Sequence, residues 1–223
     1  MRLCHFDFSK PLELLNGVGV LVVEHTSKFI QYCRDFLLQQ EGKDGDFIWD
    51  DEGKTVSFKK EGAIVFDFFG LSLCDKKIIA GLYAQLNKTV EACFSQEYAD
   101  LAARLIAFAD LLNLESPVSI EYDAECTVPD LLKALKVQPQ KAEKPFAEKI
   151  ASWLDAQAEF VGVTVFVLVN ARAYLEDSDF KLLLEHISYA PYSVLFLEKA
   201  QGNRVAKEPI RIMDHDLCEI IVE

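Results

Sequence analysis

The chain has 223 residues, of which 51% are apolar, so it can bury one large core or two modest ones. Its 36 acidic residues outnumber the 23 basic residues and give a formal charge of −13, which excludes a surface uniformly coated for nucleic acid. Any basic binding surface must therefore be local. Because the first residues lack a signal-peptide core and no apolar run reaches the roughly 18 residues of a membrane span, we expect a cytoplasmic protein that does not contact membranes.

The first block, residues 1–70, has the pattern of an α/β domain. The run VGVLVV at 18–23 is typical of a buried strand, and a helix is expected from Thr26 to about Gln40. The inward face of that helix is expected to comprise Phe29, Ile30, Cys33, Phe36 and Leu37. FIWDDEGKTVSF at 47–58 predicts two strands joined by a hairpin turn, and AIVFDFF at 63–69 predicts another strand.

A strand leading directly into a helix is the place where a nucleotide-binding α/β protein carries its phosphate loop. Here the chain passes through Glu24, His25 and Thr26 instead, which puts a carboxylate where a phosphate would need backbone N–H groups and a lysine. The tripeptide GKT at 53–55 does not replace the loop, because Ile48 stands where its first glycine would be and a strand-like segment follows. The sequence therefore predicts an α/β fold without a nucleotide site.

The middle block, residues 71–160, reads as an inserted α-helical domain. Its apolar positions repeat at helical spacing at Ile78, Leu82, Leu86 and Val90, and again at Tyr98, Leu101, Leu105, Phe108 and Leu112. This spacing predicts two helices packed lengthwise on each other. Thr127 offers a cap for a further helix, and the segment 146–157 predicts one more. Between them, SPVSIEYD at 116–123 has the alternation of an isolated strand.

The acidic residues of this strand-like segment are a candidate metal site. If the segment is extended, the period of two places Glu121, Asp123 and Glu125 on one face. Three like charges repel one another unless the face is solvated or a hard cation such as calcium bridges the oxygens. The spacing does not match an EF-hand loop, so a solvated face and a metal site both remain open.

Basic residues gather late in the middle block, at Lys133, Lys136, Lys141, Lys144 and Lys149, with few acids between Lys133 and Lys144. Such a stretch can follow a phosphate backbone without reading bases, which would make binding steeply salt-dependent. The alternative is an ordinary solvated helix face followed by a loop.

The third block, residues 161–223, returns to the α/β pattern. VGVTVFVLV at 161–169 is typical of a central parallel strand buried on both faces, and a helix follows from about Ser178. SVLFLE, PIRIM and LCEIIV supply three short strands. The simplest assembly is one discontinuous α/β domain, residues 1–70 plus 161–223, with the helical domain 71–160 inserted.

The histidines give no strong metal or catalytic signal. Asp214-His215-Asp216 lies between two strand-like segments, where a turn is the simplest interpretation. His5, His25 and His186 have no cysteine or histidine neighbour at ligand spacing, and no hydrolase or metalloprotease motif occurs.

An ordered series of segments nevertheless resembles one known family. The series is LVVEHTSKF with the QYC helix, FIWDDEGKTVSF, VFVLVNARAYLEDSDF, EHIS, SVLFLE and DHDLCEII. In it the sequence resembles the small CRISPR-associated protein of type II-A systems that acts in spacer acquisition, the Csn-two family. The resemblance implies a parallel-sheet domain related to phosphate-loop ATPases but lacking the nucleotide site, with an inserted α-helical domain.

The same resemblance implies a function. Members form a calcium-dependent homotetrameric ring that binds the ends of double-stranded DNA without sequence preference, have no known catalytic activity, and work beside the CRISPR integrase and effector nuclease. A ring also accommodates the net charge, because its channel can be basic while its exterior stays acidic. A protein-only adaptor and a metal-dependent nuclease or ATPase remain alternatives.

Carried to this chain, the resemblance implies calcium ligands at Glu121, Asp123 and Glu125. The channel lysines that it implies are Lys133, Lys136, Lys141 and Lys144.

Overall fold

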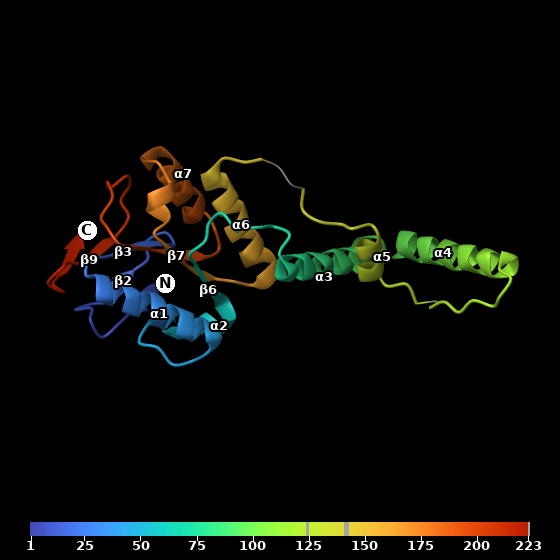
Figure 1. Cartoon of the computed structure of the whole chain (residues 1–223), viewed down its shortest axis with the longest axis horizontal. Helices are drawn as coiled ribbons and strands as arrows, with labels where there is room; N and C mark the ends of the chain where they lie inside the picture. The colour runs from blue at the N-terminus through green and yellow to red at the C-terminus, as the bar shows by residue number, and fades with distance from the viewer. Residues whose placement is uncertain (124, 141–142, 223) are drawn as a thin grey trace. The chain divides into compact units, whose positions relative to one another are not determined.

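The computed structural model describes residues 1–123, 125–140 and 143–222 (Figure 1). Its contacts divide the chain into a main unit, Met1–Leu73 with Ala142–Glu223, and a helical unit, Cys74–Lys141. The helix α6 (Phe146–Val161) belongs to the main unit, whereas the sequence prediction placed it in the inserted domain. Its Ile150 and Leu154 are wholly buried in the core of the main unit, which explains the assignment. The division into an α/β domain, residues 1–70 plus 161–223, and an inserted helical domain, residues 71–160, stays a prediction.

A six-stranded sheet forms the centre of the main unit, in the order β10-β9-β3-β8-β7-β6. Its strands are β3 (Val18–Val23), β6 (Gly62–Val65), β7 (Val165–Val169), β8 (Ser193–Glu198), β9 (Ile210–Met213) and β10 (Glu219–Val222). All neighbours pair in parallel except β10, which is antiparallel to β9. Every residue of β3, β7 and β8 is buried, as expected of parallel strands covered on both faces. The predicted mixed α/β fold with a parallel sheet is confirmed.

Helices cover the two faces of this sheet. In Figure 1, α6 and α7 (Asp177–Ser188) lie on one side of the sheet and α1 (Thr26–Glu41) lies on the other. The side chains of the strands alternate accordingly: Val20 and Val22 join the core beneath α6 and α7, and Leu21 and Val23 join the core beneath α1. A short 3-10 helix, Ala171–Tyr174, follows β7.

A small antiparallel sheet, ordered β2-β1-β4-β5, adds to the core beneath α1. Its strands are β1 (Arg2–Cys4), β2 (Leu12–Glu13), β4 (Ile48–Asp51) and β5 (Lys54–Val56), and the short helix α2 (Phe58–Glu61) follows β5. Glu52 and Gly53, which join β4 to β5, have φ angles of 51° and 86°. Positive φ at both central residues is typical of a type I′ hairpin turn, so the predicted hairpin is confirmed.

The helix α1 has the predicted extent but a different inward face. Cys33 and Phe36 are buried as expected, whereas Ile30 and Leu37 are exposed by 53% and 43%, and the unpredicted Tyr32 is wholly buried. The small sheet explains the difference, because Phe47 beside β4 packs on both Tyr32 and Phe36. The helix therefore buries the side that carries Tyr32 and Phe36, and Ile30 and Leu37 remain exposed to water.

The helical unit contains α3 (Lys76–Cys93), α4 (Ser95–Glu115) and α5 (Val128–Ala134). Thr127 caps α5 as predicted, since its hydroxyl accepts from the backbone N–H of Asp130 at 3.3 Å. The predicted lengthwise packing of the first two helices is wrong: Figure 1 shows α4 continuing along the direction of α3. Phe94 alone separates the two helices, which is too short a connection for α4 to fold back on α3.

The predicted strand at 116–123 is also wrong, since the described residues between α4 and α5 contain no strand. A strand needs a neighbouring strand for its backbone N–H and C=O groups. Here the segment is tied to α4 instead: the N–H of Ile120 donates to Asn113 Oδ1 at 3.0 Å, and the hydroxyl of Tyr122 donates to Asp110 Oδ1. Among the described residues, no helix has the length and apolar character needed to cross a membrane.

Candidate functional site

The junction between β3 and α1 lies at the edge of the sheet where α/β proteins bind nucleotides. The N–H of Glu24 donates to the carbonyl of Met213 at 2.8 Å, and the ammonium of Lys199 donates to the carbonyl of Glu24. His25 caps α1, because its Nδ1 accepts from the N–H of Lys28 at 3.3 Å. These polar groups are satisfied within the protein, so the junction offers a carboxylate rather than a cradle for phosphates.

A buried acid lies at the same edge of the sheet. Glu198 ends β8, is only 4% exposed, and accepts from the N–H of Arg172 at 3.2 Å. Burial raises the pKa of this carboxyl to about 7. The guanidinium of Arg172 lies 4.1 Å from the ring centre of Phe180 and pairs with Asp177 at 2.6 Å. Sequence reasoning missed Glu198, although a glutamate that ends the apolar run SVLFLE is a visible signal.

The structure places the predicted calcium ligands on the segment between α4 and α5. Glu121, Asp123 and Glu125 are all exposed, and Asp123 Oδ1 accepts from the N–H of Glu125 at 2.9 Å. Within the described part of the chain, these three carboxylates do not form a group with all ligand atoms within 4.8 Å of one another. The three acids are therefore close in sequence, but their carboxylates do not gather at one point, and calcium binding there stays a prediction.

The predicted DNA-binding lysines fall into both units. Lys133 and Lys136 are exposed in the helical unit, where the ammonium of Lys133 lies 3.3 Å from Asp130. Lys136 follows α5 with a φ of 54°. Lys141 lies outside the described residues. Lys144 belongs to the main unit and donates to Ser152 Oγ at 2.8 Å, so the lysines do not form one surface of a single unit.

The helix α4 of the helical unit has no buried residue. Six large apolar side chains of this helix are 39% to 80% exposed: Leu101, Leu105, Phe108, Leu111, Leu112 and Leu114. The helical spacing of Leu101, Leu105, Phe108 and Leu112, together with Tyr98, had predicted a seam with another helix, and no residue of α4 is buried in the described structure. Leu101, Leu105, Phe108 and Leu112 share one face of α4 at helical spacing, and an exposed apolar face of this kind is a candidate surface for a partner.

Comparison with known proteins adds an independent observation. The family model described as CRISPR-associated protein (Cas_Csn2) matches residues 39–217. A curated relative, the CRISPR-associated protein Csn2 of Enterococcus faecalis, is 24% identical to the chain over 204 residues. That alignment covers 89% of the chain and 90% of the relative. Both matches extend through the main unit and the helical unit.

Proposed function

The chain belongs to the Csn2 family of CRISPR-associated proteins, and on that premise we propose that it acts in CRISPR adaptation as a non-enzymatic binder of double-stranded DNA ends. It assembles as a homotetrameric ring, requires calcium for the binding conformation, and reads no base sequence. It works beside the CRISPR integrase and the effector nuclease. The single observation that carries this proposal beyond family membership is the exposed apolar face of α4.

The face of α4 supports assembly with further copies of the chain. With a formal charge of −13, the chain repels its own copies at long range, so association requires a strong short-range attraction. Leucine and phenylalanine side chains buried between copies supply that attraction through the hydrophobic effect. Closed rings of identical chains use one such surface repeatedly.

The junction between β3 and α1 supports a role without ATP hydrolysis. The parallel sheet, in which β3 leads directly into α1, is consistent with descent from a phosphate-loop ATPase. The carboxylate of Glu24 lies where a phosphate would bind, and the N–H groups of Glu24, Lys28 and Phe29 already donate within the protein. The scaffold is then retained for assembly rather than for nucleotide chemistry.

In the ring, the predicted lysines attract DNA and the predicted carboxylates bind calcium. Lys133, Lys136 and Lys144 are exposed, and closure of a ring directs such lysines into a channel while the acidic exterior repels DNA. Calcium bridges carboxylates of the segment that contains Glu121 and Asp123, which removes the repulsion between them.

Binding to linear and covalently closed DNA of the same sequence and length tests the proposal. We expect the linear duplex to bind in the presence of calcium, the closed circle to bind far more weakly, and the affinity for the linear form to fall steeply with salt. Equal affinity for the two forms would contradict end binding. A parallel incubation of the protein with magnesium, ATP and end-labelled DNA should give neither phosphate release nor shortened DNA, and either product would contradict the non-enzymatic role.

A further inference from the structure

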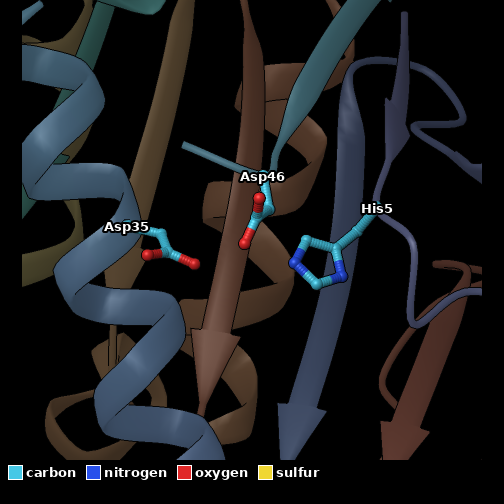
Figure 2. A group of neighbouring side chains, drawn as sticks. All are labelled: His5, Asp35 and Asp46. Atoms are coloured by element: carbon cyan, nitrogen blue, oxygen red, sulfur yellow. The ribbon is translucent and has the colours of Figure 1, made fainter. Parts of the chain in front are cut away.

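Three potential metal ligands meet between α1 and the small sheet of the main unit. His5 follows β1, Asp35 lies on α1, and Asp46 lies shortly before β4. One ligand atom from each residue lies within 4.8 Å of the other two. Figure 2 shows the imidazole of His5 and the carboxylates of Asp46 and Asp35 directed toward the space between them. In this view the ring nitrogen nearer the carboxylates is the one farther from the Cβ attachment, which is Nε2.

Two buried polar atoms of this group have no hydrogen-bond partner in the described chain. The side chain of His5 is fully buried, and its Nε2 is unpartnered. Asp35 Oδ2 is likewise buried and unpartnered. Natural proteins rarely leave a buried nitrogen and a buried carboxylate oxygen unpaired, because each loses its hydration without compensation. A bound cation between them would coordinate both atoms.

The orientation of His5 is already fixed as a metal-bound imidazole requires. Its ring packs against Phe47 and Tyr32, with centroid distances of 4.5 Å and 4.9 Å. Its Nδ1 accepts from the N–H of Asp7 at 3.1 Å and lies 3.3 Å from Asp7 Oδ2. Metal-bound histidines in proteins usually donate the N–H of their other nitrogen to such a carboxylate.

The carboxylate of Asp7 is itself held in place. The hydroxyl of Tyr32 donates to Asp7 Oδ2 at 2.8 Å, and the ammonium of Lys28 pairs with the same oxygen. Nδ1 of His5 faces both the N–H and the carboxylate of Asp7. A metal ion at Nε2 requires the neutral ring to carry its proton on Nδ1, which then donates to Asp7 Oδ2 in place of accepting from the N–H of Asp7.

The donor set selects the kind of ion. One imidazole nitrogen and two carboxylate oxygens suit divalent first-row metals, whereas calcium and magnesium prefer sites made only of oxygen. Three protein ligands are also the number found in sites that keep one position for water or a further ligand. We propose that His5, Asp35 and Asp46 bind a divalent metal ion of the zinc or manganese type, at a site separate from the calcium region between α4 and α5.

The site can be tested on the full-length, metal-free protein with Zn2+ as the probe, by calorimetry and by the thermal midpoint of unfolding. Asp46→Asn is the main variant because the side chain is exposed and its loss should not prevent folding. The matched control is Asp44→Asn, an exposed aspartate of the same loop that is outside the group. Zinc held by cysteines or by other acids contributes equally in wild type, control and variant. Only the difference in zinc binding between Asp46→Asn and the other two proteins therefore reports this site.

We expect Zn2+ to bind to wild type and to Asp44→Asn with equal affinity and to raise their thermal midpoints. Asp46→Asn should bind at this site at least about tenfold more weakly, with a smaller rise in midpoint. Asp35→Asn should lose binding in the same way, and circular dichroism of both variants checks their fold. Equal zinc affinity in wild type and Asp46→Asn, no zinc binding by wild type, or displacement of zinc by equimolar calcium would overturn the proposal. The assay contains no DNA, so its outcome is independent of the proposed DNA-end binding.

Discussion

The buried carboxyl of Glu198 makes stability depend on pH in a way that one substitution can isolate. Burial raises its pKa in the folded chain from the ordinary 4.5 to about 7. Between these two values the folded chain holds a proton that the unfolded chain has released. The contribution of Glu198 to stability is therefore complete below about pH 4.5 and is lost as the pH rises through 7.

The two pKa values set the size of the effect. A difference of one in pKa corresponds to about 1.36 kcal/mol, so the interval from 4.5 to about 7 gives at most about 3 kcal/mol. Glu198→Gln keeps an oxygen that can accept from the N–H of Arg172 and removes the ionisation. The unfolding free energy of wild type minus that of Glu198→Gln should therefore fall by up to about 3 kcal/mol between pH 4.5 and 7.

Urea denaturation monitored by tryptophan fluorescence at several pH values between 4.5 and 8 measures this difference. Trp49 is buried in the main unit and reports its unfolding. Glu115→Gln makes the same chemical change on an exposed residue and controls for the loss of one charge. A difference between wild type and Glu198→Gln that stays constant, or that rises with pH, would refute the buried-acid explanation.

Three further predictions test the core, the proposed assembly surface and the proposed DNA contact. Phe36→Ala removes a fully buried ring and should lower the unfolding free energy by about 3 to 5 kcal/mol in urea denaturation. A loss below about 1 kcal/mol would contradict the place of Phe36 in the core. Phe108→Asp should reduce the native mass measured by light scattering, whereas Leu182→Asp, the same kind of change on α7, should leave it unchanged. Lys136→Ala should weaken binding to linear DNA and lower the slope of log affinity against log salt by about 1, with Lys88→Ala as the control. Unchanged DNA binding by Lys136→Ala would favour a protein-only adaptor.

The central sheet could be predicted because its strands carry their signal locally. The apolar runs at 18–23, 165–169 and 193–198 are buried on both faces, so their sequence needs no knowledge of their neighbours. The hairpin was likewise visible, because Gly53 tolerates the positive φ of its turn and strand-like segments flank it.

The sequence-based predictions were wrong where the local structure depends on residues far away in the chain. The alternation of SIEYDAE suggests a strand, but a strand forms only beside another strand, and Ile120 and Tyr122 are tied to α4 instead. The apolar repeat of α4 predicted a seam with another helix, but these side chains are exposed, because the repeat carries no information on where a partner helix lies. The packing of Phe47 on α1 is a tertiary effect of the same kind, because it leaves the side chain of Ile30 exposed to water.

The group at His5 could not be found from spacing. Its three members come from the end of β1, from α1 and from the segment before β4, and no short motif joins them. The sequence showed only that His5 has no cysteine or histidine neighbour at ligand spacing. What brings the residues together is the packing of the small sheet against α1.

The mass of the native particle with and without calcium tests the central claim of assembly most directly. In the presence of calcium, light scattering at micromolar protein should give about four times the 25.2 kDa mass of the chain. Chelation of calcium should change the mass or the hydrodynamic radius of the particle. A persistent 25.2 kDa monomer in calcium would contradict the account.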